Sequence, residues 1–212
     1  MNGETVTELG RKAKGDEEIR VDGQLLPHEE KVVFLLHKPK NVISSVSDEK
    51  GRKTVADLID SEYRLYPVGR LDFSSSGLLL MTNDGQLMQE IIHPRYQIDK
   101  TYLVTIDGLI KEDEIRKLQE GINIEGKKTA PCSVELVKKN EHKQTTELQM
   151  TIHEGRNRQI RKMMESLGYG VIRLHRIKEA CIELGDLKAG EYRRLKPYEI
   201  KKLRAYLDRF DR

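Results

Sequence analysis

The segment "GLLLMTND" (residues 77–84) constrains the fold most, because an unbroken apolar run closed by a turn signal is typical of a buried strand. The segment before it, "GRLDFSSS" (69–76), brings the carboxylate of Asp72 to the entrance of that strand. A loop supported by a rigid strand is a frequent place for catalytic or binding residues. These residues also allow a structural role, in which Asp72 pairs with Arg70 or caps a turn through the serines at 74–76.

Periodicity along the rest of the chain predicts an α+β order rather than a strict alternation of strands and helices. We expect further strands at 32–39, 41–47, 66–68, 100–108, 132–137, 146–153, 170–177 and 181–184, and a hairpin at 18–26 that turns at Asp22-Gly23. We expect a short amphipathic segment at 51–59, helices at 86–93, 111–121 and 157–168, and a last helix that begins at Pro197.

Two of these elements show which residues face the core. The strand at 100–108 alternates, with Tyr102, Val104 and Ile106 on one face. The helix at 157–168 collects its apolar residues on one face, namely Ile160, Met163, Met164 and Leu167. That arrangement leaves Arg158, Arg161 and Lys162 on the opposite side or on the flanks of the helix.

Composition limits the classes of protein to which the chain can belong. Charged residues make up 34% of its 212 residues, and no stretch is long and apolar enough to cross a bilayer. The N-terminal segment lacks the apolar core of a signal peptide, so we expect a globular cytoplasmic protein. Cys132 and Cys181 lie far apart and the six histidines show no ligand spacing, so we expect reduced thiols and no bound metal.

The basic residues are concentrated in two runs, although the net charge is only +3. The first run is opposed only by Glu165 and comprises Arg156, Arg158, Arg161, Lys162, Arg173, Arg176 and Lys178. The second comprises Arg193, Arg194, Lys196, Lys201, Lys202, Arg204 and Arg209. Two such runs favour a polyanionic partner, although a charge run on a helix can also be a solvated surface.

Four segments, in order, resemble motifs of the RNA pseudouridine synthases, in the RsuA-like branch that modifies ribosomal RNA. They are "GRLDFSSSGLLLMTNDG" (69–85), "HPRYQIDKTYLV" (93–104), "EGRNRQIRKMMESLG" (154–168) and "VIRLHRI" (171–177). The resemblance implies a catalytic domain at residues 28–212, with a mixed, mainly antiparallel sheet, flanking helices and a central active-site cleft. It also implies a reaction that uses no cofactor. The sequence departs from the family pattern after residue 177, where a further basic residue and often a glycine are usual and Lys178-Glu179-Ala180-Cys181 stands instead.

The N-terminal segment "NGETVTELGRKAKGDEEIRVDG" (2–23) resembles the end of an S4-type RNA-binding domain. The pattern starts part-way through that module. We therefore expect residues 1–27 to be the C-terminal part of an S4-like module that precedes the catalytic domain.

The family resemblance assigns roles to the residues around Asp72. It implies that Asp72 is the catalytic carboxylate, which attacks the uracil ring, attacks the ribose C1′ or removes the C2′ proton; all three routes remain open. A carboxylate must stay ionised in such a pocket, and the resemblance gives Arg161 as the guanidinium that holds it charged and oriented. Arg70 is the second candidate for that partner, or else orients the loop or contacts RNA.

The same resemblance assigns the residues that surround the substrate. Tyr102 would lie against the uracil and mediate proton movement at C5, and Lys100 would support it. Leu174 would form the opposite apolar wall. Without the resemblance, Tyr102 and Leu174 are interpreted as ordinary strand and core residues. A uridine must be flipped out of the RNA to enter, and Arg156 and Arg158 at the start of their helix are candidates for its phosphates.

These assignments predict an enzyme that converts uridine in ribosomal RNA to pseudouridine. Large-subunit 23S rRNA is the expected substrate, and small-subunit 16S rRNA or tRNA are the alternatives. A non-catalytic RNA-binding assembly factor is a different hypothesis, which the intact set of Asp72, Tyr102 and Arg161 disfavours. A hydrolase with Asp72 as nucleophile lacks a partner at a recognisable spacing. Nothing in the sequence demands more than a monomer.

Overall fold

The structure is a computed structural model of the chain, and it describes residues 3–8, 10–11, 17–26 and 29–210. It divides into two units, Met1–Lys31 and Val32–Arg212, which are described separately. The sequence predicts a boundary after residue 27, whereas the division in the structure follows Lys31.

The first unit contains a short hairpin of β1 (Arg20–Val21) and β2 (Gln24–Leu25). Its turn residues Asp22 and Gly23 both have positive φ, 50° and 79°, which is the backbone that an Asp-Gly hairpin turn adopts. The hairpin predicted at this turn is therefore confirmed. The S4-like assignment of residues 1–27 falls partly on positions outside the described residues.

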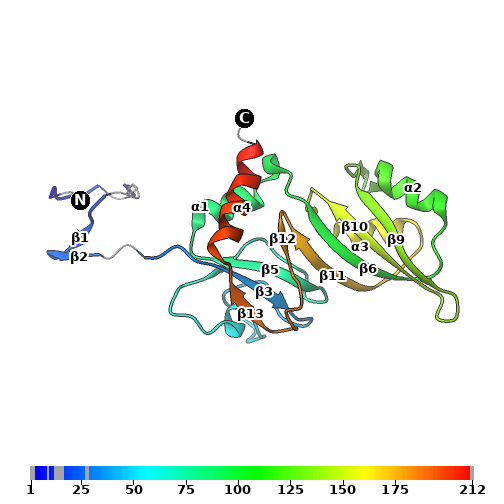
Figure 1. Cartoon of the computed structure of the whole chain (residues 1–212), viewed down its shortest axis with the longest axis horizontal. Coiled ribbons are helices and arrows are strands. Elements are labelled where there is room, and N and C mark those ends of the chain that lie inside the picture. The colour runs from blue at the N-terminus through cyan, green and yellow to red at the C-terminus, as the bar shows by residue number, and fades with distance from the viewer. Residues whose placement is uncertain (1–2, 9, 12–16, 27–28, 211–212) are drawn as a thin grey trace. The chain divides into compact units, whose positions relative to one another are not determined.

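The second unit is built on a sheet of nine described strands in the order β13-β3-β5-β11-β6-β10-β9, with β4 paired to β5 and β12 to β11 (Figure 1). The strands are β3 (Val33–Lys38), β4 (Tyr66–Pro67), β5 (Ser76–Thr82), β6 (Lys100–Asp107), β9 (Ser133–Asn140), β10 (Thr145–Ile152), β11 (Val171–Glu179), β12 (Ile182–Glu183) and β13 (Tyr192–Arg194). β5 and β11 run parallel, and the other described pairs are antiparallel. The predicted α+β fold with a mixed, mainly antiparallel sheet is confirmed.

Helices cover both faces of this sheet. They are α1 (Gly85–Ile92), α2 (Glu112–Glu120), α3 (Gln159–Ser166) and α4 (Pro197–Leu207), with short 3-10 turns at Ala56–Leu58, Pro94–Tyr96 and Asp208–Phe210. Alternate residues of β5 belong to two separate apolar clusters, because successive side chains of a strand point to opposite faces. The cluster around Leu79 and Met81 includes residues of α2 and α3, and the cluster around Leu78 and Leu80 includes residues of α1 and α4.

Most of the predicted core residues are buried, and one charged residue predicted to lie outside the core is buried as well. Tyr102, Val104 and Ile106 of β6 belong to one buried cluster, as their alternation predicts. The apolar face of α3 is buried as well. Arg161, which the sequence places on a flank or the opposite side of that helix, is itself only 8% exposed. A buried guanidinium needs partners in the protein interior, and these partners belong to the candidate site.

The strand predicted at 41–47 is wrong. Its only described ladder contact is an isolated bridge between Ile43 and Thr54. Val42 packs into the core instead, and the Ser44 hydroxyl hydrogen-bonds the backbone of Leu71. The segment therefore uses its polar groups to hold a neighbouring loop and does not extend the sheet.

Three short strands are absent from the prediction. β7 (Asn123–Ile124) and β8 (Lys127–Lys128) form a small hairpin, and β13 adds an edge strand beside β3. These strands have only two or three residues, and β8 and β13 consist mainly of basic ones, so no apolar alternation can be read from them. Their pairing depends on tertiary contacts that the local sequence does not reveal.

Gly77 allows β5 and β11 to approach each other. It has a φ of +116°, and a Cβ atom at this position would overlap the backbone of Arg176. In the parallel register Gly77 is paired with Arg176. The glycine therefore brings the strand that follows Asp72 against the strand that carries Leu174.

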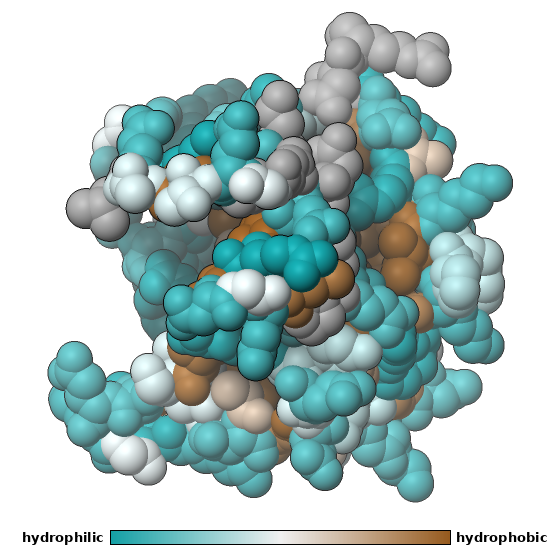
Figure 2. Space-filling model, turned by 90° about the vertical axis from the view of Figure 1, so that its left-hand side faces the viewer, coloured by the Kyte–Doolittle hydropathy of each residue, from teal (hydrophilic) through white to brown (hydrophobic). Residues whose placement is uncertain are grey.

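The face shown in Figure 2 is mainly hydrophilic, with hydrophobic residues in small separate patches. Such a surface agrees with the 34% of charged residues in the chain. None of the helices in the described ranges is long and apolar enough to span a membrane.

Candidate active site

The loop at residues 71–75, which precedes β5, is held by Lys38 at the end of β3. The Lys38 Nζ atom donates hydrogen bonds to the backbone carbonyls of Pro39, Asp72 and Ser75, at 3.1, 3.1 and 2.9 Å. Its side chain is fully buried, and burial lowers the pKa of Lys38 to about 8 against the opposing effect of the Asp72 charge. One ammonium group therefore fixes the backbone on both sides of the loop.

The segment Pro39–Ser44 adds further hydrogen bonds to the same loop. The Ser44 hydroxyl accepts from the Leu71 amide at 3.1 Å and donates to the Leu71 carbonyl at 2.9 Å. The Asn41 amide donates to the carbonyl of Phe73 at 2.7 Å. The backbone at Leu71, Asp72 and Phe73 is thus tied to one neighbouring segment. These contacts fix the backbone of Asp72, so they hold its carboxylate in place just before the buried strand β5.

Arg161 from α3 reaches this loop from the opposite side. Its Nε atom lies 3.9 Å from Oδ2 of Asp72, its Nη2 donates to Ser75 Oγ at 3.4 Å, and its Nη1 donates to the carbonyl of Val171 at 3.0 Å. Burial, the largest effect, lowers the pKa of Arg161, while the Asp72 charge raises it. The Asp72 side chain keeps 33% of its area exposed. The carboxylate is therefore paired with a guanidinium and still accessible.

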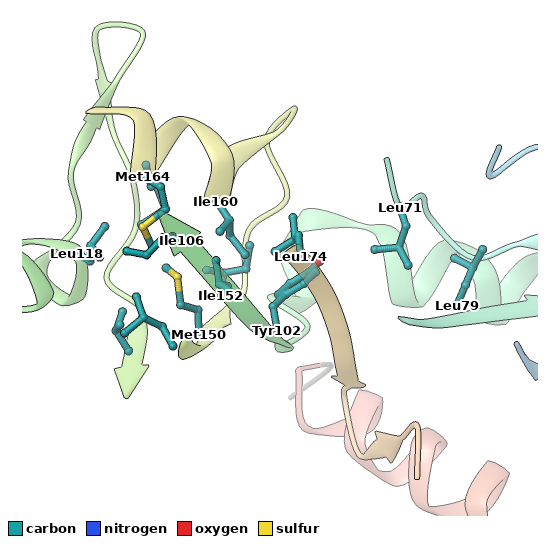
Figure 3. Packing of buried hydrophobic residues seen from close by; sticks show 14 of the residues in the cluster. Leu71, Leu79, Tyr102, Ile106, Leu118, Met150, Ile152, Ile160, Met164 and Leu174 are labelled. Carbon is teal, nitrogen blue, oxygen red and sulfur yellow. The ribbon is translucent and has the colours of Figure 1, made fainter. Parts of the chain in front are cut away.

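Tyr102 and Leu174 meet beside this pair. Both belong to the apolar cluster on one face of the sheet, and Figure 3 shows them next to each other, with Ile152 and Ile160 nearby. Burial, the largest effect, raises the pKa of Tyr102, and the Asp72 charge adds to that rise. The phenol therefore lies within electrostatic reach of the carboxylate.

A cleft of about 680 Å³ opens next to Tyr102. Besides Tyr102, its lining includes Arg70, Lys100, Arg156, Arg176 and Glu179. The volume is in the range of pockets that hold a ligand the size of a nucleotide. Its lining combines basic side chains, which suit a phosphate, with apolar ones such as Ile98, Ile152 and Ile160.

The rim formed by residues 154–159 is organised by Glu154. Its Oε1 accepts from the Ala130 amide at 3.0 Å and from Gln159 Nε2 at 2.6 Å, and its Oε2 pairs with Arg156 Nε at 3.3 Å. Arg156 also donates to the carbonyls of Lys127 and Lys128, at 3.1 and 2.6 Å. This network joins the β7–β8 hairpin to the start of α3.

Comparison with known proteins decides the family of this chain. The family described as RNA pseudouridylate synthase matches residues 32–166. Ribosomal large subunit pseudouridine synthase B of Bacillus subtilis is 48% identical over 98% of this chain and 86% of that protein. The chain belongs to the RNA pseudouridine synthase family. It is accordingly an enzyme that acts on RNA as an isomerase.

Two further comparisons agree with this membership. Ribosomal large subunit pseudouridine synthase E of Vibrio parahaemolyticus is 37% identical over 77% of this chain and 73% of that protein. A crystal structure of a pseudouridylate synthase superposes with a TM-score of 0.76 and 34% identity, and it covers 95% of this chain and 86% of that chain.

The predicted residues of the synthase fall into two groups. Asp72 and Arg161 form an ion pair at the loop that precedes β5, Leu174 belongs to the apolar cluster with Tyr102, and none of these three predicted residues lines the cleft. Arg70, Lys100, Tyr102 and Arg156 line the cleft. Lys100 donates to the carbonyl of Ile98 at 3.0 Å, and burial, the largest effect, lowers its pKa. Arg158 is exposed at the N-cap of α3 and does not line the cleft.

The structure changes the interpretation of the first basic run. Arg161 and Arg176 are buried, at 8% and 2% exposure, so their charges are not available to a partner at the surface. Arg156 already donates to the backbone of the β7–β8 hairpin. Arg158 and Arg173 are exposed. The basic surface of this region is therefore smaller than the sequence suggests.

Sequence reasoning missed three polar residues of this region, namely Lys38, Arg176 and Glu179. Arg176 had a usable signal, because it stands two residues after Leu174 on the same side of one strand. A charged residue in phase with a core leucine indicates a buried charge that needs a partner. Lys38 had a weaker signal, since it ends an apolar strand immediately before Pro39.

Proposed function

We propose that this synthase converts uridine to pseudouridine in ribosomal RNA, with a large-subunit RNA as its substrate. The observation that carries the proposal is the preset Asp72 carboxylate, paired with Arg161 and held by Lys38 next to a cleft. The large-subunit assignment is supported by two relatives, pseudouridine synthases B and E of the large subunit.

The reaction is an isomerisation, so atoms and protons balance within the nucleotide. The bond between C1′ and N1 breaks, the uracil turns, and a bond forms between C1′ and C5. N1 takes up one proton and C5 loses one. We assign to Asp72 the role of nucleophile or base in this sequence, whether it attacks the uracil ring, attacks C1′ or removes the C2′ proton.

The surroundings of Asp72 suit this role. A bound uracil covers the exposed third of its side chain. The guanidinium of Arg161, 3.9 Å from the carboxylate, and the ammonium of Lys38 on the Asp72 carbonyl supply positive charge beside it. The clamp on the backbone limits its movement, which lowers the entropic cost of reaching the reactive geometry.

The remaining predicted residues bind the flipped nucleotide. Tyr102 lies against the uracil and mediates proton movement at C5, and Leu174 supplies the apolar wall beside it. Flipping a uridine out of stacked RNA costs a few kcal/mol, which contacts to the phosphates offset. Arg70, Arg156 and Arg158 are the candidates for these contacts, and Lys100 supports the floor of the cleft.

Three further assignments complete the proposal. Residues 1–27 belong to an S4-like module that contributes RNA affinity, and residues 28–212 form the catalytic domain. The enzyme works as a monomer. Its location is the cytoplasm, where ribosomal RNA is found in a bacterium such as the organisms of its relatives.

The test is tritium release from transcripts labelled at C5 of uracil, with 23S rRNA, 16S rRNA and tRNA offered separately. The proposal predicts release from 23S rRNA, at a single position or a few positions. Release only from 16S rRNA or tRNA would contradict the large-subunit assignment. Tight RNA binding without release from any transcript, including partly assembled subunits, would support an assembly factor instead.

A further inference from the structure

Four side chains from two adjacent strands form what we term the polar floor of the cleft. They are Lys100 and Tyr102 of β6 and Arg176 and Glu179 of β11. The register pairs Tyr102 with Arg176 and Lys100 with Glu179. Directly opposed residues of neighbouring strands project from the same face of a sheet. The two residues that sequence reasoning missed therefore stand beside the two that it predicted.

Arg176 and Glu179 form a buried ion pair with incomplete hydrogen bonding. Both side chains are 2% exposed, and Arg176 Nη2 lies 3.4 Å from Glu179 Oε2. Within the described part of the chain neither of these two atoms has a hydrogen-bond partner. Such a pair seldom adds net stability, because desolvation offsets its attraction. A buried pair of this kind beside a cleft points to a role in the site.

The position of Arg176 is fixed from a second side. Its Nε atom donates to the carbonyl of Leu78 in β5 at 2.7 Å. Gly77, the preceding residue, permits this approach, since a larger residue would overlap the Arg176 backbone. The guanidinium is therefore anchored between the strand that follows Asp72 and the carboxylate of Glu179.

The anchored guanidinium acts on Tyr102. Burial raises the pKa of Tyr102, and the charge of Arg176, its register partner on β11, opposes that rise. The effect is mutual, because burial lowers the pKa of Arg176 while Glu179 and Tyr102 raise it. A guanidinium carries only hydrogen-bond donors, so a phenol oxygen beside it can only accept from it. Figure 3 shows Tyr102 beside Leu174 in the apolar cluster, and Tyr102 and Arg176 both line the cleft.

We propose that Arg176, held by Glu179, is a positioning residue that fixes the Tyr102 hydroxyl for the removal of the C5 proton. This inference rests on the proposed function, since it deepens the role given to Tyr102. Arg176 does not touch the reacting atoms. It serves the step in which C5 loses its proton after the new bond to C1′ has formed.

The variant that tests the inference is Arg176→Met/Glu179→Leu, which removes both charges and leaves neither buried alone. A matched control is Lys117→Met/Asp113→Leu, an ion pair of 3.4 Å on α2 whose side chains are 60% and 53% exposed. Single-turnover rates are measured on RNA with uracil or 5-deuterouracil at the target. RNA affinity is measured in parallel.

We expect the rate of the test variant to fall at least tenfold with unchanged RNA affinity. We also expect its deuterium isotope effect to exceed that of the unaltered chain, because C5 proton loss then limits turnover. Arg176→Lys should recover part of the rate. The control pair should change neither quantity. A full rate, or a loss of rate without a larger isotope effect, would overturn the inference.

A second measurement needs no turnover. In a chain labelled with ¹³C at the tyrosine Cζ atoms, the Tyr102 resonance is identified by its absence in Tyr102→Phe. It should shift in Arg176→Met/Glu179→Leu and stay in place in the control. An unmoved resonance would overturn the inference even if the chain showed no activity. Failure of the unaltered chain to release C5 tritium from any RNA would contradict the proposed function alone.

Discussion

The Lys38 ammonium donates a hydrogen bond to the backbone carbonyl of Asp72 at 3.1 Å, from a fully buried position. The two residues are 34 positions apart in the chain, and the contact fixes the backbone from which the Asp72 carboxylate extends. Lys38 also bonds the carbonyl of Ser75, so it spans the loop. A loop of this kind is preorganised, which is the property that a catalytic carboxylate requires.

Lys38 should give the enzyme a distinctive dependence of stability on pH. Its pKa is about 8 in the folded chain and about 10.4 in an unfolded one. Between these values the unfolded chain holds more protons, so folding stability rises with pH. The free energy of unfolding of the unaltered chain minus that of Lys38→Met should therefore increase from pH 8 to 10, with a slope approaching ~1.4 kcal/mol per unit. Urea unfolding at three pH values measures this, and a constant difference would be the contrary result.

Ser44→Ala should reduce turnover while leaving RNA affinity nearly unchanged. The substitution removes both hydrogen bonds to the Leu71 backbone, which costs roughly 1–3 kcal/mol of stability and frees the loop next to Asp72. We expect kcat to fall about tenfold, which corresponds to ~1.4 kcal/mol. The control is Ser74→Ala, an exposed serine in the same loop. Equal kinetics for the two variants would argue against the clamp.

Gly77→Ala should destabilise the catalytic domain severely. The added Cβ overlaps the Arg176 backbone at a φ that favours glycine, so β5 and β11 must separate. A cost of about 3 kcal/mol or more is expected. Gly85→Ala is the matched control, because Gly85 begins α1 with no atom within 4 Å of an added Cβ. Thermal unfolding compares the two, and similar midpoints would show that close strand approach is not required.

Arg158→Glu should weaken RNA binding and flatten its dependence on salt. Arg158 is exposed at the N-cap of α3, where a helix terminus also favours phosphate. Loss of one phosphate contact should reduce the slope of log affinity against log salt by about 1. Arg116→Glu, an exposed residue of α2, controls for net charge. Equal slopes for both variants would remove Arg158 from the RNA interface. Arg156→Glu is a less clean test, because Arg156 also holds the β7–β8 hairpin.

Local pattern was enough to predict the main elements of this fold. The apolar run at 77–84 and the alternation at 100–108 became the central strands β5 and β6. The strand predicted at 41–47 is wrong although Val42 and Ser44 have the spacing of a strand. Val42 packs into the core, and Ser44 hydrogen-bonds the backbone of Leu71. Periodicity reports which residues face the core, and it does not report which polar groups bond across 27 positions.

The candidate site was only partly visible in the sequence. The proximity of Asp72 and Arg161 follows from family motifs, and the structure places them 3.9 Å apart. Lys38, Arg176 and Glu179 are charged residues that the tertiary packing buries. From composition alone, charged residues are expected at the surface, so these three were not predicted. A basic run can therefore contain core residues, as Arg161 and Arg176 show.

The most direct test of the account is the release of tritium from C5 of uracil in 23S rRNA by the unaltered chain and by Asp72→Asn. The substitution preserves the shape of the side chain and removes its charge, so RNA binding should remain within about twofold. The account predicts that release falls by at least ~1,000-fold, or about 4 kcal/mol in transition-state stabilisation. Release by Asp72→Asn at the rate of the unaltered chain, with equal RNA affinity, would contradict it.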